Sequence, residues 1–514
     1  MEIRGVKLKK QVRYSKGNGF FVLREPNYFS VPLLADDGER PLRAVNVGDM
    51  VKEGTLIAKP TGRYGSFVYS PCSGKVIGVV NKLNASGNEC EHVVISRDLE
   101  NAKEFLPAMA EEDMRHEPLL RRLYQSGMVD NFEPFDPAYK KYLLRCEIKT
   151  LVINCTEDDP YKSSDTALIE TYVSEVVEGA KLLKTVARAE KLVFIFTNKQ
   201  KKIASQVRKY LKELQEHKTI KIKIYPDIYP LHDSRLIAYY QTGKMVPEGS
   251  RTAPTSVIVE SPSNCYDFFN AAKKNIPCIQ KAVTISGKNC LRKANYFVKN
   301  GTSIEHILKI VGTKEEYDEN MLIYGGIMSG IAQETLDISA TLTASCILFV
   351  NREEYSRDKE SPCINCGKCV ECCPVKIHVK NLDDAIVNRE FSKAKKLGVE
   401  ACIGCGACSY ICPAKRYLAQ RISFAKDISQ GNFGKAANSS EFSNVGLEEV
   451  KHDENDVRVE KKENYSAPVD KEGEIPAVDE MLELLKQEKE TVNTKDTKFR
   501  IIDATGGGKK WINY

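Results

Sequence analysis

Residues 363–374 read CINCGKCVECCP, and residues 402–413 read CIGCGACSYICP. Each stretch places four cysteines at the spacing C-x2-C-x2-C-x3-C, with a proline directly after the fourth cysteine. Thiolates two residues apart on a tight loop can each reach a different iron of one cubane. The two stretches therefore predict a pair of [4Fe–4S]-binding loops in one small domain.

This repeated spacing is typical of bacterial ferredoxins with two [4Fe–4S] clusters, in which the fourth cysteine of each run ligates the other cluster. Gly367, Gly404 and Gly406 let backbone N–H groups approach the cluster sulfides. Pro374 and Pro413 end the two loops. The expected ligands are Cys363, Cys366, Cys369 and Cys412 for the first cluster, and Cys402, Cys405, Cys408 and Cys373 for the second.

Two zinc sites are the competing interpretation, because Cys-x-x-Cys pairs also bind zinc. Zinc needs two separated pairs of ligands, and it does not explain why the longer run with its proline occurs twice. Cys372, beside Cys373, is expected to be a spare thiol. If Cys372 were the ligand, Pro374 would stand one place out of register.

The composition of the 514-residue chain narrows its partners and its compartment. Lys and Arg total 76 against 70 Asp and Glu, and no basic stripe interleaved with aromatics occurs, so no nucleic-acid partner is expected. The 17 cysteines and an N-terminus without an apolar signal segment indicate reduced thiols in the cytoplasm. No run of 18 apolar residues occurs, so we expect membrane attachment only through partner subunits, on the inner face of the cell membrane.

The N-terminal domain, residues 1–115, is predicted to be a barrel-sandwich hybrid. The stretch VNVGDMVKEGTLIAKP alternates apolar and polar residues, with turns at Gly48 and Gly54, and is similar to biotinyl and lipoyl carrier domains. Those carriers present a lysine at a hairpin tip, where this chain has TGRYGS at 61–66. A structural or docking barrel is therefore favoured over a swinging arm.

The next domain, residues 116–270, is predicted to be Rossmann-like, because strands alternate with helices. TLVINC, KLVFIFTN and TIKIKIYPDIYP are the expected strands, and residues 166–187 and 201–217 are the expected helices. This pattern does not by itself establish a cofactor.

Three further segments complete the multidomain α/β and α+β class. Residues 271–345 are expected to form a small β-grasp-like (SLBB) domain with one helix, and residues 346–425 the dicluster ferredoxin domain. Residues 426–514 are charged and poor in aromatics, so they cannot bury enough surface to offset chain entropy, and we expect them to be disordered.

In this order the domains resemble the C subunit of Rnf-type electron-transport complexes, over roughly residues 30 to 425. The resemblance is carried by VGDMVKEGTLIA, SPCSGKV, INCTEDDPY, VTISG, YGGIMSG and CSYICPAKRYL. In that family the α/β domain is similar to the flavin-binding subunit of respiratory complex I, holds FMN and receives hydride from NADH. The resemblance implies that Asn154, Glu157 and Asp159 are the remnant of a flavin or NADH site.

The sequence departs from the family at the flavin loop. The family's G-x-G-G-A-G-F-P is replaced after Val129 by DNFEPFDP at 130–137. A loop without glycine cannot bring its amides close to a phosphate, and the carboxylates of Asp130, Glu133 and Asp136 would repel a dianion. We therefore expect FMN and NADH binding to be lost or weakened.

Other polar and thiol residues receive plainer interpretations. His232 and Asp233 are expected to be an exposed turn pair, and the acidic row at 157–159 either faces a nicotinamide or flavin or is a solvated loop. Cys146 and Cys155 are expected to be buried small hydrophobes.

Three functions remain open from the sequence. The first is an RnfC-like iron–sulfur relay between a reduced donor (NADH through a flavin, or ferredoxin) and a partner oxidoreductase, as in clostridial proline reductase systems. The second is a working RnfC protein that oxidises NADH or exchanges electrons with ferredoxin, coupled by membrane partners to ion translocation. The third is a non-enzymatic assembly module with structural clusters. No catalytic residue is assigned, because the clusters carry single electrons and a two-electron donor needs a flavin.

Overall fold

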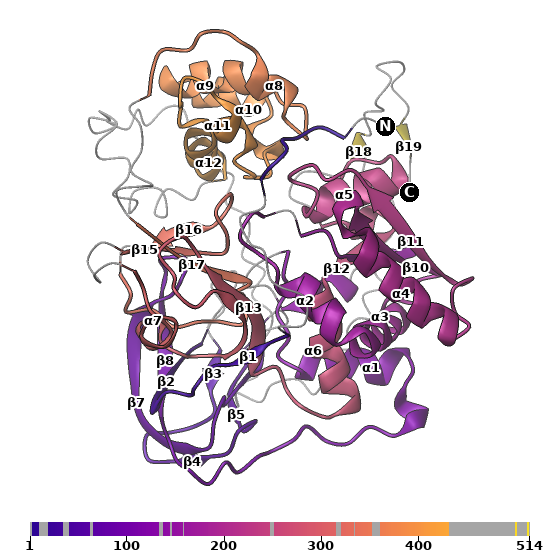
Figure 1. Cartoon of the computed structure of the whole chain (residues 1–514), viewed down its shortest axis with the longest axis vertical. Coiled ribbons are helices and arrows are strands. Elements are labelled where there is room, and N and C mark those ends of the chain that lie inside the picture. The colour runs from indigo at the N-terminus through magenta and orange to yellow at the C-terminus, as the bar shows by residue number, and fades with distance from the viewer. Residues whose placement is uncertain are drawn as a thin grey trace.

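The computed structural model describes most of the chain up to residue 430. Figure 1 shows the N-terminal barrel and a second β sheet on one side, the α/β domain on the other, and a helical segment above them. The flavin-loop residues Glu133 and Asp136, the hairpin tip 62–64, Asp158 and nearly all of the expected tail lie outside the described residues. Those described are 3–9, 19–33, 41–61, 65–132, 137–143, 146–157, 159–246, 251–314, 320–333, 335–351, 360–430, 499–500 and 511–512.

The N-terminal domain consists of two small sheets around a shared core. Its apolar centre includes Phe29, Ile57 and Ile95, which are fully buried. Gly54 has a φ of +95°, and a Cβ there would lie 2.1 Å from the Glu104 carbonyl oxygen, so this turn requires glycine. The strand orders are β2 (Tyr28–Pro32), β8 (Glu89–Arg97), β7 (Gly74–Leu83), β4 (Met50–Val51), and β3 (Leu42–Arg43), β5 (Leu56–Lys59), β6 (Val68–Tyr69).

The α/β domain is a four-stranded sheet in which every pairing is parallel. Leu192 and Phe194 face one layer of helices, while Val193 and Ile195 face the other, as the two-residue period of a strand requires. Helix α5 (Ser234–Thr242) covers the second face. The order is β11 (Ile220–Tyr225), β10 (Lys191–Thr197), β9 (Thr150–Asn154), β12 (Val257–Glu260), and the first face carries α1 (His116–Gln125), α3 (Val173–Ala187), α4 (Lys201–Glu213) and α6 (Pro262–Lys273).

The single helix expected over residues 166–187 is two helices. Helix α2 (Ser164–Thr171) ends at Tyr172, whose backbone (φ −127°, ψ 45°) is not helical, and α3 begins at Val173. The Tyr172 ring packs against Tyr266 and Phe297, with centroids 5.0 and 6.1 Å away. Phe297 belongs to a different sheet, so the break is explained by tertiary packing that helical periodicity cannot reveal.

The sheet between the barrel and the iron–sulfur loops is six-stranded and covered by helix α7 (Ile304–Val311). Its last strand along the chain, β17 (Cys346–Asn351), pairs with both β13 and β15. This domain therefore extends past the boundary expected at residue 345. The N-terminal strand β1 joins its edge. The order is β1 (Phe21–Val22), β14 (Ala294–Lys299), β13 (Gln280–Ser286), β17, β15 (Asn320–Tyr324), β16 (Ile331–Gln333).

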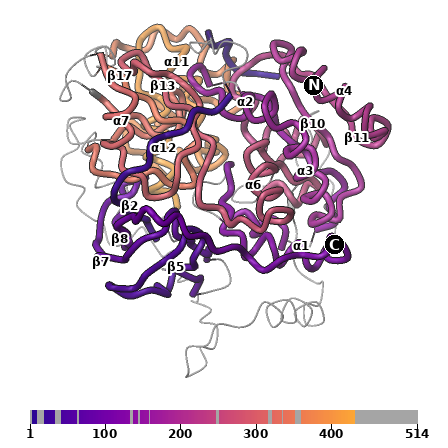
Figure 2. Tube along the Cα trace, turned by 60° about the horizontal axis from the view of Figure 1, so that its bottom comes forward, coloured from indigo at the N-terminus to yellow at the C-terminus, as the bar shows by residue number. Residues whose placement is uncertain are grey.

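The iron–sulfur segment consists of short helices around a small core that includes Leu382, Val399 and Ile422. Figure 2 shows it on the same side of the molecule as α7 and β17, with α3, α4 and α6 on the other side. Helix α12 (Leu418–Ser429) runs past residue 426, so the expected tail begins later than predicted. The other helices are α8 (Lys368–Glu371), α9 (Val379–Val387), α10 (Phe391–Lys396) and α11 (Ala407–Ile411).

Within the described part of the chain, none of the helices has both the length and the apolar character needed to span a membrane. Of the expected tail beyond α12, only the paired strands β18 (Phe499–Arg500) and β19 (Trp511–Ile512) are described.

Candidate iron–sulfur site and adjoining cavity

The thiols of the first cysteine run gather around a hollow of about 370 Å³ that we call the first-loop hollow. Cys363, Cys366 and Cys369 line it, and so does Cys412 from the end of the second run. The pKa of Cys369 is raised by burial and by the neighbouring thiols of Cys412, Cys363 and Cys366. The fourth member of this group therefore comes from the opposite loop, as the ferredoxin spacing predicts.

The second group shows the reciprocal arrangement. The pKa of Cys405 is raised to about 12, by burial and then by the thiols of Cys402 and Cys373. The pKa of Cys408 is raised by burial and by Cys405, Cys402, Cys372 and Cys373. The structure thus brings Cys373, along with its neighbour Cys372, close to the cysteines of the second run.

These two groups match the expected ligand sets, which stay a prediction until metal is measured. Among the described residues, no three His, Cys, Asp or Glu side chains converge on a position for a single metal ion. The case for cubanes rests on the repeated spacing and on the exchange of the fourth cysteine between the loops.

The backbones of the two loops follow the same course. Asn365 and Gly404 both have positive φ, 56° and 69°. Their N–H groups donate to the first thiol of each run, Cys363 Sγ and Cys402 Sγ, both over 3.4 Å. A role for Asn365 was not predicted from the sequence. Asparagine nevertheless tolerates this conformation, and Asn365 occupies the position of Gly404 when the two runs are aligned.

A buried ion network supports the first loop. Asp383 accepts from Arg416 Nη2 at 2.6 Å and from Arg421 Nη1 at 3.1 Å. Arg416 and Asp383 also line the first-loop hollow, together with Lys380. No motif marks these residues in the sequence, and the structure alone places their charges beside the expected first cluster.

Cys372 is separated from the first-loop hollow. It is 7% exposed, packs with Val6, Leu8 and Tyr229, and its thiol donates to the Cys369 carbonyl oxygen over 3.6 Å. Burial raises the pKa of Cys372 to about 12, so its thiol is protonated at neutral pH. This placement supports its interpretation as a spare thiol.

A second cavity of about 390 Å³ adjoins the second loop and is called here the switch-point cavity. The cavity opens at the ends of the neighbouring strands β9 and β12. The order of the strands in the sheet reverses between these two strands. Ligands of open α/β sheets bind at this position. Gly404 and Cys405 also line the cavity, so it touches the second cysteine run.

The expected remnant residues Asn154, Glu157 and Asp159 all line the switch-point cavity. Asn154 Oδ1 accepts from the Thr156 N–H at 3.1 Å, and its amide donates to the His232 carbonyl oxygen at 3.0 Å. Asp159 Oδ1 accepts from the Tyr161 N–H at 2.9 Å. All three side chains therefore form hydrogen bonds with backbone groups around the cavity.

Glu157 is buried, which rules out the solvated-loop interpretation for this residue. Its two carboxylate oxygens accept the backbone N–H groups of Asp165 (3.0 Å) and Thr166 (3.1 Å) at the start of α2. The carboxylate thus satisfies helix N–H groups that would otherwise be free to bind an anion.

The Asp130 carboxylate does not face the cavity as the sequence suggested. It is 2% exposed and lies 2.8 Å from Lys141 Nζ, which also lies 3.1 Å from Glu260 Oε1. Its negative charge is therefore compensated inside the domain, and repulsion of a phosphate by Asp130 is not supported.

His232 and Asp233 are half-buried, so the expected exposed turn pair is corrected. Both line the switch-point cavity. Asp233 is the N-cap of α5 and accepts from the N–H groups of Arg235 and Leu236. Cys155 is fully buried as expected, whereas Cys146 is half-buried.

The second cysteine loop is docked onto its neighbours by close backbone contacts. The Tyr229 hydroxyl donates to the Cys405 carbonyl oxygen at 2.7 Å. A Cβ on Gly406, whose φ is +71°, would lie 2.8 Å from the Met328 carbonyl oxygen. The α/β domain and the six-stranded sheet therefore both hold this loop against the cavity.

Three family models match successive parts of the chain. The RnfC barrel sandwich hybrid domain matches residues 2–100, the Nuo51 FMN-binding domain residues 126–266, and a 4Fe-4S dicluster domain residues 355–413. These matches, with the paired cysteine loops, place the chain in the class of multidomain proteins that carry a 4Fe-4S dicluster domain.

Curated relatives narrow this class. The C subunit of the ion-translocating oxidoreductase complex of Actinobacillus succinogenes is 28% identical over 360 residues, which cover 67% of this chain and 51% of the relative. The C subunit of the proton-translocating ferredoxin:NAD(+) oxidoreductase complex of Clostridium ljungdahlii is 26% identical over 379 residues, 73% of this chain and 82% of that protein. The chain is therefore similar to the RnfC family, both in its domains and in these relatives.

The chain spans about half the length of the first ion-translocating relatives that it matches, from 43% to 53%. A chain of the crystal structure of NAD+-reducing [NiFe]-hydrogenase in the H2-reduced state matches at 12% identity and a TM-score of 0.45, over 64% of this chain and 63% of that one.

Proposed function

We propose that this chain is an RnfC-like iron–sulfur relay that passes electrons between a reduced donor and a partner oxidoreductase. The observation that carries the proposal is the gathering of the cysteines into two groups of four, each completed by the opposite loop. Two [4Fe–4S] clusters held there would each accept and release single electrons.

The positions of the two loops support a direction for the path. The second loop lies against the switch-point cavity through Cys405, whereas Cys363 and Cys366 of the first loop are exposed. The protein thus places one loop beside an internal cavity and the other at the surface. We propose that the donor side is the cavity and that a partner docks over the first loop.

We further propose that the switch-point cavity does not hold FMN. A flavin phosphate would be expected at helix N-termini, where free N–H groups attract anions. Here Glu157 occupies the first N–H groups of α2, and Asp233 those of α5. A phosphate would have to displace a carboxylate at either helix.

The charge of the cavity supports the same proposal. Its cations are already bound to neighbouring acids, with Lys162 Nζ 2.9 Å from Asp165 and Arg235 Nη2 3.1 Å from Asp233. A dianionic phosphate would therefore meet an excess of like charge. The lining carboxylates are Glu157, Asp159, Asp165 and Asp233, against the cations Lys162 and Arg235.

A working RnfC protein that oxidises NADH through FMN is the second candidate. It is favoured by the match to the Nuo51 FMN-binding domain and by the cavity at the reversal of strand order. Under this candidate, ion translocation would be performed by membrane partners.

Flavin release and cluster bleaching separate the two candidates. The full chain is purified, reconstituted anaerobically, and denatured to measure free flavin; a second sample is mixed with NADH and then with dithionite. The relay predicts flavin far below one per chain, slow bleaching by NADH and rapid bleaching by dithionite. Stoichiometric FMN with fast NADH bleaching would establish the second candidate, and clusters that dithionite cannot reduce would exclude both.

The partners proposed are other electron-transfer proteins on the cytoplasmic side. The curated relatives belong by name to ion-translocating and proton-translocating complexes, which supports Rnf-type membrane subunits as partners; a soluble amino-acid reductase is the alternative. Cell fractionation distinguishes them, because a chain bound to membrane subunits sediments with membranes, whereas one bound to a soluble reductase co-elutes with that enzyme.

A further inference from the structure

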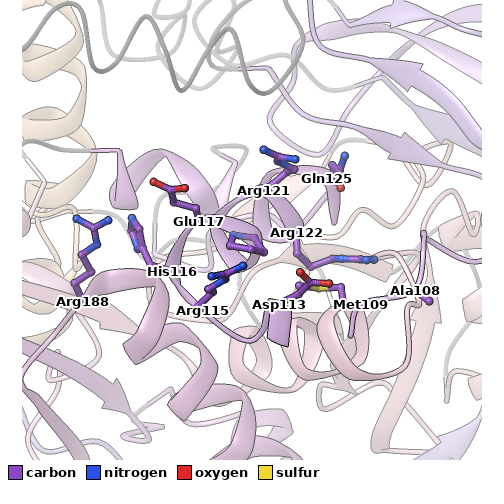
Figure 3. Close-up of a pocket in the computed structure, with 11 residues that line it drawn as sticks. Ala108, Met109, Asp113, Arg115, His116, Glu117, Arg121, Arg122, Gln125 and Arg188 are labelled. Atoms are coloured by element: carbon purple, nitrogen blue, oxygen red, sulfur yellow. The ribbon is translucent and has the colours of Figure 1, made fainter. Parts of the chain in front are cut away.

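A third cavity of about 590 Å³ lies at the start of α1 in the α/β domain. None of its lining residues lines the switch-point cavity or the first-loop hollow. Figure 3 shows arginines from α1, from the residue before it and from the end of α3 spread along it. We call it the arginine cavity, and its cationic residues are Arg115, Arg121, Arg122 and Arg188.

The arginine cavity carries an excess of positive charge. Its four arginines face two carboxylates, Asp113 and Glu117. Arg115 and Arg188 are exposed, and within the described residues neither is tied to a carboxylate. His116 adds no charge at neutral pH, because burial and the nearby Arg188 lower its pKa.

The first turn of α1 adds to the positive potential. Its N-cap is Arg115, which makes no side-chain hydrogen bond to the helix N–H groups. An uncapped helix start attracts anions through its free N–H groups and its dipole. A helix start alone does not make a binding site. The residue that favours anion binding here is Arg122, further along α1.

Arg122 is a buried cation that lacks a full set of partners. It is 3% exposed, and its Nη2 donates to the Pro107 carbonyl oxygen. Its Nη1 has no hydrogen-bond partner among the described residues. A buried charge without a counter-charge is unfavourable, and an anion in the adjoining cavity would supply one.

We propose that the arginine cavity binds a small polyanion that bears two or more phosphate groups. Guanidinium groups match phosphate oxygens in a planar, bidentate geometry. Four arginines against two carboxylates leave an excess of two positive charges, so a monoanion would compensate only half of it, whereas a diphosphate, which can reach more than one arginine, would compensate it in full. The volume of the cavity falls within the range of small-ligand sites, about 300–1,000 Å³.

The probes are inorganic pyrophosphate and ADP, titrated by calorimetry into the full reconstituted chain at low salt. The test variant is the double substitution Arg115→Gln and Arg188→Gln, which removes two exposed charges without disturbing buried Arg122. The matched control is Arg208→Gln, an exposed arginine on α4 outside the cavity. Thermal unfolding and cluster absorption verify that each variant is folded.

The proposal expects saturable binding of pyrophosphate or ADP that weakens with salt. The double variant should bind about tenfold more weakly or worse, and Arg208→Gln should bind like the parent chain. Tighter ADP binding would identify a nucleotide, and tighter pyrophosphate binding a free polyphosphate; both support the site. No saturable binding of either probe, or equal weakening in the control, would overturn it.

Discussion

At the scale of single residues, Cys372 and Cys373 are chain neighbours in different surroundings. Cys373 lies near the thiols of Cys405 and Cys408, whereas Cys372 lies near Cys408 and also packs against Tyr229 and the N-terminal segment. The sequence pattern predicts Cys373 as the ligand and Cys372 as a spare thiol, and the folded chain shows which side chains surround Cys372.

Alanine substitutions at this pair test the exchange of ligands between loops. Cys373→Ala should cost the second cluster a ligand, so reduced protein should lose roughly half of its cluster EPR intensity, as one of two clusters is affected. Cys372→Ala is the matched control and should keep both signals. Loss of signal in Cys372→Ala with Cys373→Ala unaffected would reverse the assignment.

Arg416 provides a charge test beside the first loop. A nearby cation stabilises the more negative, reduced form of a cluster, so Arg416→Gln should lower the potential of the first cluster, by on the order of tens of millivolts. Asp383 keeps its contact with Arg421 in this variant. EPR-monitored redox titration measures the shift, with Arg208→Gln as control; an unchanged or higher potential would contradict the assigned position.

At the scale of elements, the two cysteine loops are a repeat, but their docking differs. The second loop is held by Tyr229 and by the close approach of Gly406 to Met328, while the first loop leaves Cys363 and Cys366 exposed. The second loop therefore contacts other domains of this chain, whereas the first loop presents two cysteines to solvent.

Gly406→Ala should loosen the second loop. The new Cβ would stand 2.8 Å from the Met328 carbonyl oxygen, and the residue would keep a positive φ. We expect a loss of stability of at least about 1 kcal/mol and a faster loss of the second cluster on air exposure. Gly87→Ala is the control, since Gly87 has a φ of +77° with no atom near its added Cβ. Equal effects of the two variants would remove the docking contact from the account.

At the scale of the whole molecule, the iron–sulfur segment should depend on its clusters for order. Its core is small, and its helices run from 4 to 12 residues. Segments of this size seldom hold together by hydrophobic burial alone. Removal of iron by a chelator should therefore raise amide exchange across residues 360–430 and leave β9 and β10 protected. Unchanged protection of the segment in the metal-free chain would refute this dependence.

Much of the architecture could be read from the chain, because its signals are local. The apolar run KLVFIFTN predicted a strand, and the repeated cysteine spacing predicted the paired groups. The break at Tyr172, the cap made by Glu157 and the ion pair of Arg416 with Asp383 could not be predicted, since each depends on contacts made only in the folded protein. The arginine cavity likewise joins Arg115 to Arg188, which no local motif connects.

Elemental analysis of the anaerobically purified full chain tests the central claim most directly. Two cubanes predict about eight irons and about eight acid-labile sulfides per polypeptide, with no stoichiometric zinc. Material that holds zinc alone, without labile sulfide, would contradict the account.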